Sequence, residues 1–396
     1  MKDIVIIANF CRDFSKNDNG RFQYLCKELS KTDQVEIITS DFSHSLKTKK
    51  GKLTHDWPFT ITFLDEPGYQ KNISIKRFWS HRKWGRNVGK YLEKRKKPDI
   101  IYCAVPSLTA ALSAMKYCKR NKVKFVVDIQ DLWPEAFYMA LNVPILSNLL
   151  FFPFKRIADK VYRNADEICG VSKSYVERAL KKNVKNAKGH VAFLGTELET
   201  FDEGATVQPY VFKENKDDLW VGYCGSLSAS YDIGCVLNAL QIIREKKNTM
   251  PRMIIMGDGL QRESFAKTAQ EKELDVVFTG RLPYDQMCAT LKQCDILINP
   301  ITKRSAASII NKHGDYAAAG LPVINTQESS EYRSLIEEYH MGLNCKNGDA
   351  DDVAQKIMYL MDHPEERYQM GCNSRKCAEE RFDRRNSYLE LLSVFT

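Results

Sequence analysis

The chain has 396 residues, of which 43% are hydrophobic and 28% charged, a composition typical of a globular protein with two or three domains. No apolar run reaches the ~20 residues that a bilayer-spanning helix needs, and the first residues predict a buried strand and not a secretory signal. Charge is uneven, because residues 1–200 hold 36 Lys and Arg against 21 Asp and Glu, whereas the rest of the chain holds 23 against 29.

Short apolar, β-branched runs alternate with helical patterns along the chain. In the first half they are Ile4–Ala8, Val35–Thr39, Thr60–Leu64, Ile100–Cys103, Lys124–Ile129, Glu167–Val171 and His190–Leu194. In the second half they are Trp220–Cys224, Met253–Met256, Val276–Thr279, Ile296–Asn299, Pro322–Asn325 and Gly342–Cys345. This alternation predicts an α/β protein with two doubly wound, Rossmann-like domains of parallel sheet.

The predicted domain boundary lies in the polar stretch 199–218, which contains Gly204 and Pro209 and is typical of a linker. We assign residues 1–200 to an N-terminal domain and 201–375 to a C-terminal domain. The 12 cysteines form no C-x-x-C pair, which predicts free buried thiols in a reducing cytoplasm. The seven histidines show no metal-ligand spacing, so we expect no metal.

The segment 71–97 is strongly basic, with 11 Lys and Arg and a single acid, Glu93. Phe78, Trp79, Trp84 and Tyr91 are interleaved with these charges. The pattern fits either a surface that attracts an anionic membrane or another polyanion, or a solvated basic helix with an aromatic core face.

Polar residues follow the strands of the first half at their carboxyl ends, where open parallel sheets bind ligands. The loop after the first strand ends in Asn19 and Gly20, and the fifth strand ends in segment 128–135. Its polar residues include Asp128, Gln130, Asp131, Trp133 and Glu135. Asp131 can orient or deprotonate an acceptor hydroxyl, or it can cap the next helix, and both interpretations stay open.

Four strand ends of the second half carry glycine or polar residues. They are Gly225-Ser226, Gly257-Asp258-Gly259, Gly280-Arg281-Leu282 and Asn299-Pro300, the last leading through Lys303, Arg304, Ser305 and Ser308 to a helix. Glycine lets backbone N–H groups approach an oxyanion, and the other residues add donors and charge, so a nucleotide diphosphate is the natural ligand. The chain has no G-x-G-x-x-G after a strand and no G-x-x-x-x-G-K-[ST], which disfavours a dehydrogenase and a P-loop ATPase.

Segment 311–324 predicts a short helix that ends at Gly320 and leads into a strand. Lys312 and Asp315 are three residues apart and therefore share one face of this helix. Lys312 adds positive charge to a helix N-terminus that already suits anions, although an ordinary surface ion pair fits the same two residues.

These segments together resemble the retaining glycosyltransferases of the GT4 family. The resemblance runs through Gly222–Leu227, Met256–Gly259, Phe278–Leu282, Cys294–Pro300, Tyr316–Val323 and His363–Arg367, and covers nearly all of residues 219–385. It implies a GT-B fold, with two facing domains, a nucleotide sugar held by the C-terminal one and an acceptor by the N-terminal one. It also implies retention, no metal or other cofactor, and a last helix, 376–396, that returns to the N-terminal domain.

Asp131–Glu135 resembles the branch of that family that builds bacterial capsule, O-antigen or exopolysaccharide. The resemblance implies an acceptor carried by polyprenyl diphosphate at the cytoplasmic face of the inner membrane. We expect the nucleotide sugar to be UDP-linked, although the residues do not name the nucleobase. The basic first half suits an anionic membrane surface, and the run Ile145–Phe154 either dips into that interface or belongs to the core. We expect no nucleic acid partner.

Three departures from the family pattern matter. Ser226 and Tyr231 stand where basic residues often grip the diphosphate, so Lys312 with Lys303 or Arg304 must supply that charge. Ala307 and Asp315 stand in place of two glutamates. Gln130 stands in place of a histidine, so Asp131 or the donor phosphate must take the acceptor proton.

We therefore assign catalytic roles to Asp131, Lys312 and Asp315. The donor-binding set is Gly225, Ser226, Tyr231, Gly257, Asp258, Arg281, Leu282, Lys303, Arg304, Ser305, Ser308, Ile309, Ile310 and Asn311. The acceptor-side set is Asn19, Gly20, Asp128, Gln130, Trp133 and Glu135. A sugar-nucleotide epimerase or hydrolase of the same fold and a non-catalytic membrane-surface protein are the alternatives.

Overall fold

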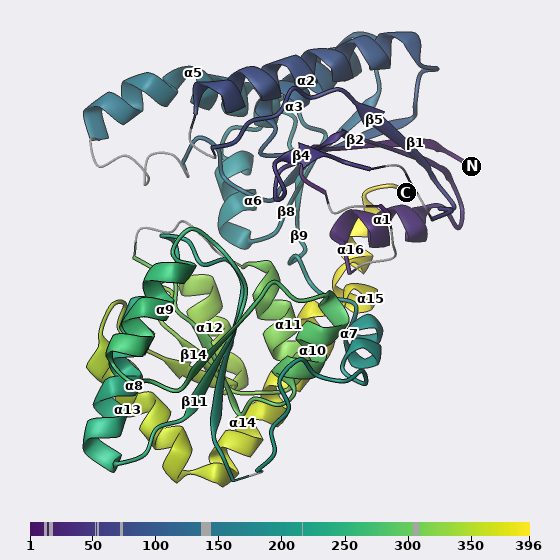
Figure 1. Ribbon diagram of the computed structural model, residues 1–396. Helices are drawn as coiled ribbons and strands as arrows, with labels where there is room; N and C mark the ends of the chain where they lie inside the picture. The colour runs from purple at the N-terminus through teal and green to yellow at the C-terminus, as the bar shows by residue number, and fades with distance from the viewer. Residues whose placement is uncertain are drawn as a thin grey trace. The chain divides into compact units, whose positions relative to one another are not determined.

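The computed structural model describes the chain except for residues 12–13, 16–18, 52, 54, 72–73, 136–143, 216 and 304–308, and describes 144–150 by backbone alone. The chain forms two compact units (Figure 1). The N-terminal unit contains Met1–Leu194 and Ser387–Thr396, and the C-terminal unit contains Gly195–Asn386. The chain therefore leaves the first unit after Leu194 and returns to it at Ser387, whereas the sequence placed these boundaries at 200 and 376.

The N-terminal unit is built on a seven-stranded parallel sheet with the order β5-β2-β1-β6-β7-β8-β9. Its strands are β1 (Asp3–Ala8), β2 (Gln34–Ser40), β5 (Thr60–Leu64), β6 (Ile100–Val105), β7 (Lys124–Ile129), β8 (Glu167–Gly170) and β9 (Lys188–Val191). A two-residue antiparallel pair, β3 (Phe42–Ser43) and β4 (Thr48–Lys49), follows β2. The sequence did not predict this pair, because two-residue strands carry no periodic pattern.

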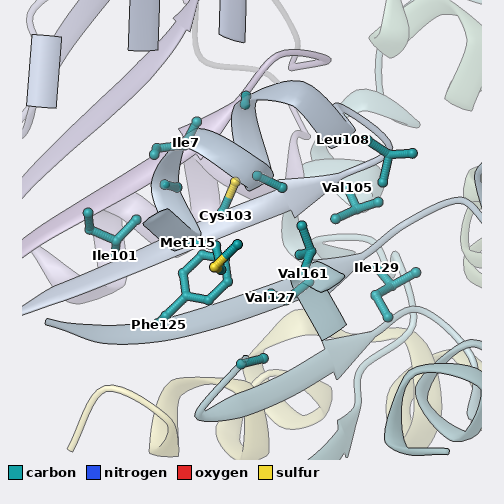
Figure 2. Packing of buried hydrophobic residues seen from close by; sticks show 14 of the residues in the cluster. Ile7, Ile101, Cys103, Val105, Leu108, Met115, Phe125, Val127, Ile129 and Val161 are labelled. Atoms are coloured by element: carbon teal, nitrogen blue, oxygen red, sulfur yellow. The ribbon is translucent and has the colours of Figure 1, made fainter. Parts of the chain in front are cut away.

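Helices cover both faces of this sheet. They are α1 (Arg21–Leu29), α2 (Ile75–Lys94), α3 (Leu108–Asn121), α5 (Pro144–Arg163), α6 (Lys173–Leu180) and α16 (Leu389–Ser393). Strand side chains alternate between two cores: Val5 and Ile7 pack with α2, α3, α5 and α6, whereas Ile4 and Ile6 pack with α1 and α16. Figure 2 shows the first core from close by, with Ile7, Cys103 and Val127 on strands facing Met115 and Val161 on helices.

The C-terminal unit has a six-stranded parallel sheet with the order β12-β11-β10-β13-β14-β15. Its strands are β10 (Trp220–Cys224), β11 (Arg252–Met256), β12 (Val276–Gly280), β13 (Ile296–Asn299), β14 (Val323–Asn325) and β15 (Gly342–Asn344). Its helices are α7 (Leu198–Gly204), α8 (Ile233–Lys247), α9 (Arg262–Glu271), α10 (Tyr284–Leu291), α11 (Asn311–Ala319), α12 (Ser330–Tyr339), α13 (Ala350–Asp362), α14 (Pro364–Cys377), a π-helical turn (Ala378–Phe382) and α15 (Arg384–Ser387). One core joins strand residues such as Val221 and Ile255 to α8 and α13.

All thirteen predicted strands are present, so the α/β class with two Rossmann-like units is confirmed. The predicted linker 199–218 is wrong in part. Its first residues form α7, and Gly204 at the end of this helix packs against Asp285 of α10. The polar composition of the stretch gave no sign that Phe201 and Gly204 form a buried face of α7 together with Leu198, the residue before the stretch. The 12 cysteines are all free, and ten of them are buried, as predicted.

Candidate functional site

The candidate donor site lies at the first turn of α11, beyond the carboxyl ends of β10 and β13. The sequence dictates this short helix well: three alanines favour it, and Gly320 ends it in the left-handed conformation with φ +68°. Below the first turn, the His313 ring stacks on Tyr332 at 3.5 Å and lies 3.2 Å from the Asn299 amide. Burial lowers the pKa of His313, so this ring is neutral. The sequence analysis did not identify His313, although a histidine inside an alanine-rich helix was its visible signal.

Lys312 is the most unusual side chain of this unit. It is buried, and its ammonium nitrogen has no hydrogen-bond partner among the described residues. Nζ lies 4.2 Å from the ring centre of Tyr223 and 4.0 Å from that of Tyr231. Burial lowers the pKa of Lys312 to about 7. The alternative of a surface ion pair with Asp315 is therefore wrong.

Two opposing effects act on the Lys312 ammonium. Contact with aromatic faces stabilises a desolvated cation by roughly 2 kcal/mol. Removal of an ammonium from water costs several kcal/mol, so the rings alone do not compensate for burial. An anion that accepts a hydrogen bond from Lys312 Nζ would offset the remaining cost of burial. The arrangement thus predicts an anionic ligand at Lys312.

The strand-end glycines of this unit first serve the packing of the loops. A Cβ at Gly257 would lie 1.8 Å from the carbonyl oxygen of Gly225, and one at Gly259 would lie 2.3 Å from that of Leu227. Gly225 has φ +144° and lies beside Lys312, because a Cβ there would come within 3.1 Å of Nζ. The backbone N–H of Gly225 donates a 3.0 Å bond to the Met256 carbonyl, so the predicted approach of a glycine N–H to an anion stays a prediction.

The other predicted donor-binding residues differ in how far their side chains are exposed. Tyr231 forms one wall of the Lys312 cage, and Ser226 is exposed while its carbonyl accepts a 2.7 Å bond from the hydroxyl of Tyr223. Lys303 is 77% exposed and lies 3.8 Å from Glu328, so it does not reach into the cage in this structure. Ile309 is buried, Ile310 and Leu282 are half-buried, and Asp258, Arg281 and Asn311 are exposed. Arg304, Ser305 and Ser308 lie outside the described residues.

Asp315 is one turn further along α11. Its carboxylate accepts a 2.8 Å bond from the Tyr284 hydroxyl and a 3.2 Å bond from the Thr196 hydroxyl. Two hydroxyl donors therefore hold the carboxylate in place, so a ligand hydroxyl that reached it would compete with them. Its predicted contact with a ribose or sugar edge stays a prediction.

A second site lies in the N-terminal unit, where residues that follow β1, β5 and β7 meet the side chains of α2. The Arg77 guanidinium lies 4.6 Å from the ring centre of Trp133, 5.4 Å from that of Tyr69 and 5.8 Å from that of Phe10. His81 packs against the same three rings. Its Nδ1 is buried without a partner among the described residues, and burial lowers its pKa to about 3.

This cluster contains one predicted acceptor-side residue, Trp133, and the predicted catalytic residue Asp131. Trp133 is buried in it, and Asp131 accepts a 3.2 Å bond from the Trp133 indole nitrogen. Burial raises the pKa of Asp131, which makes it a better base, while the Arg77 charge opposes that shift. The sequence analysis did not select Phe10, Tyr69, Arg77 or His81, because they lie in loops and on α2, far from Asp131 in sequence.

Asp128 does not face an acceptor but holds the N-terminal unit together. Its fully buried carboxylate accepts 2.9 and 3.1 Å bonds from Arg21, and Gln130 donates to it at 2.9 Å. Arg21 also donates to the hydroxyl of Tyr388, which fixes the last segment of the chain to this unit. A buried guanidinium needs such a counter-ion, so Asp128 is buried with Arg21.

The remaining acceptor-side residues also have structural contacts. Gly20 is the N-cap of α1, and its carbonyl accepts from Tyr24 at 3.0 Å. Asn19 before it is buried. Glu135 forms a 2.8 Å ion pair with Arg178. No group of three or more His, Cys, Asp and Glu side chains in the described ranges is arranged to hold a metal ion.

The class of protein follows from the fold and from comparison with known sequences. Residues 207–377 match the family model described as glycosyl transferases group 1. An uncharacterised glycosyltransferase, MJ1069 of Methanocaldococcus jannaschii, is 19% identical over 75% of this chain and 74% of its own length. The chain is a glycosyltransferase, as predicted.

Comparison with solved structures confirms the GT-B fold. The chain resembles HepE of Anabaena in complex with UDP, with a TM-score of 0.68, 14% identity and coverage of 99% of both chains. It also resembles sucrose-phosphate synthase of Thermosynechococcus elongatus, with a TM-score of 0.72, 15% identity and coverage of 100% of this chain and 98% of the other.

Proposed function

We propose that the protein is a retaining, metal-independent glycosyltransferase that moves a sugar from a UDP-linked donor to a lipid-linked oligosaccharide in bacterial surface-polysaccharide synthesis. The observation that supports the donor part of this proposal is Lys312, a buried lysine beside the strand-end glycine Gly225 that has no hydrogen-bond partner within the described ranges. A diphosphate supplies the anion that this lysine lacks. HepE, which has the same fold, has been crystallised with UDP-glucose.

The proposed chemistry needs few protein groups. The bond between the anomeric carbon and the diphosphate oxygen breaks, and the acceptor hydroxyl attacks the same face of the sugar. The hydroxyl proton passes to the departing phosphate oxygen or to Asp131, and Lys312 stabilises the charge that develops on the diphosphate. A preorganised cation in a site with little water supplies this stabilisation without rearranging at the moment of reaction.

The acceptor half of the proposal rests on the cluster in the N-terminal unit. Trp133, Tyr69 and Phe10 offer aromatic faces of the kind that pack against sugar rings, Arg77 offers a held cation, and Asp131 offers a carboxylate with a raised pKa. A glycan attached to a diphosphate combines the same features.

The proposed contact with a membrane rests on the surface formed by α2 and α5, which lie along one side of the N-terminal unit (Figure 1). Phe78 of α2 packs on Phe154 of α5 at 4.9 Å. Ile75, Trp79 and Phe152 beside this contact are 88%, 54% and 52% exposed. The exposed basic residues around them are Lys76, Arg82, Lys83, Arg86, Lys155 and Arg156. We name these nine residues the α2–α5 surface; exposed apolar side chains among basic ones suit an anionic bilayer. None of the helices in the described part of the chain is long and apolar enough to cross a bilayer.

The test is a transfer assay with UDP-glucose and a polyprenyl-diphosphate-linked glycan, with the anomeric configuration of the product determined by NMR. We expect a new glycosidic bond with the donor's configuration. Lys312→Ala should lower the rate well over tenfold, since one charge-assisted bond contributes about 1.5–3 kcal/mol. Lys267→Ala, an exposed lysine of α9, is the matched control. Normal turnover by Lys312→Ala contradicts its role, and release of an epimerised or free sugar without transfer favours the alternative enzymes.

A further inference from the structure

We infer that Tyr223 and Tyr231 are positioning residues that keep Lys312 without a counter-ion until the donor arrives, so that binding of the nucleotide sugar takes up a proton from solvent. The inference rests on the proposed function, because it needs a diphosphate bound at Lys312. It goes beyond that function by assigning Tyr223 a role and by coupling donor binding to pH.

The cage around Lys312 encloses its amine, which has no hydrogen-bond partner among the described residues. Tyr223 is fully buried on β10, and the bond from its hydroxyl to the Ser226 carbonyl fixes the ring. Tyr231 closes the other side, and its ring meets that of Tyr223 at 5.9 Å in an edge-on contact. Gly225 borders the cage, because a Cβ there would lie 3.1 Å from Nζ, a tight contact. The two rings therefore determine what reaches the lysine.

The titratable groups around Lys312 in the described ranges do not supply a fixed negative charge to its nitrogen. Burial raises the pKa of Tyr223, Tyr231 and the Cys224 thiol, so these groups are neutral near pH 7. On α11 itself His313 is neutral, and Asp315 accepts bonds from Tyr284 and Thr196. A donor diphosphate would bring the missing charge.

Donor binding then changes the protonation of Lys312. A phosphate oxygen at Nζ favours the ammonium, so the amine nitrogen gains a proton and a buffer acid loses one. With a pKa of about 7, the free protein holds this proton in about a tenth of molecules at pH 8 and about nine tenths at pH 6. Binding should thus take up about 0.9 proton at pH 8 and about 0.1 at pH 6.

The experiment is calorimetric titration of the full chain with UDP-glucose and with GDP-mannose at pH 6 and pH 8, in two buffers of different ionisation enthalpy. Nucleotide sugars suit it, because they have no phosphate monoester, which titrates near pH 6. The difference in heat between buffers gives the number of protons taken up. We expect uptake at pH 8 that nearly vanishes at pH 6.

Four variants separate positioning from structure. Tyr231→Ser opens the cage to water, so the uptake at pH 8 should fall at least threefold, whereas Tyr231→Phe should keep it. Lys312→Arg carries a permanent charge and should bind without uptake. Lys267→Met should behave as wild type.

The outcomes distinguish the two claims. Binding of either nucleotide sugar without proton uptake at pH 8, or unchanged uptake in Tyr231→Ser, overturns the inference and leaves the proposed transfer reaction standing. If neither nucleotide sugar binds, the proposed donor site fails, and the inference fails with it.

Discussion

At the scale of single residues, the burial of Lys312 lowers the stability of the ligand-free protein. Its pKa is about 7 in the folded chain against 10.5 in an exposed lysine. Between these values the unfolded chain binds the additional proton, so this residue makes stability rise with pH across that window. Below about pH 7 the full cost is present. A residue that destabilises the ligand-free protein is most easily explained by a ligand that it binds.

Lys312→Met should therefore stabilise the ligand-free protein, because it fills the cage without a buried amine. Each unit of pKa shift corresponds to about 1.4 kcal/mol, so the gain should be of the order of a few kcal/mol at pH 6 and smaller at pH 9. Urea unfolding at both pH values measures it, with Lys303→Met at an exposed position as control. A Met variant that is less stable than wild type at both pH values would contradict the burial argument.

At the scale of elements, the sequence predicts best where one physical rule dominates. Central strands such as β1 and β13 are runs of apolar residues buried on both faces, and the end of α11 is determined by Gly320, so both were predicted. Three other features depend on contacts between residues that are far apart in the sequence, and these were not predicted. Gly257 at the end of β11 packs closely on Gly225 at the end of β10, and Gly204 of α7 packs on α10. Arg21 forms its ion pair with Asp128.

The candidate sites likewise combine residues adjacent in sequence with residues that only the fold brings together. Lys312 was predicted because a lysine at a helix start already suggests an anion, whereas its cage required the positions of Tyr223 and Tyr231. In the N-terminal unit, Asp131 and Trp133 were predicted from one strand end. Arg77 and His81 were not, because they reach the cluster from α2.

At the scale of the whole molecule, the excess of positive charge is carried by residues 1–200. Six of their 36 Lys and Arg side chains belong to the α2–α5 surface, beside exposed Ile75, Trp79 and Phe152. Trp84 of the same basic segment is fully buried, so the segment serves both as core and as surface.

Vesicle binding tests this surface. The protein should cosediment with phosphatidylglycerol-containing vesicles and not with pure phosphatidylcholine, and less so at high salt. Arg82→Glu with Arg86→Glu should weaken binding at least tenfold, since each basic residue near an anionic surface contributes about 1 kcal/mol. Lys267→Glu with Lys376→Glu, on exposed positions of the C-terminal unit, is the matched control. Equal loss in both pairs would show that net charge, and not this surface, drives binding.

The most direct test of the donor site is a crystal structure of the protein with UDP-glucose. The account predicts a diphosphate oxygen about 3 Å from Lys312 Nζ, with the glycine at 225 beside it. A diphosphate bound elsewhere, with Lys312 still enclosed by Tyr223 and Tyr231, would contradict it.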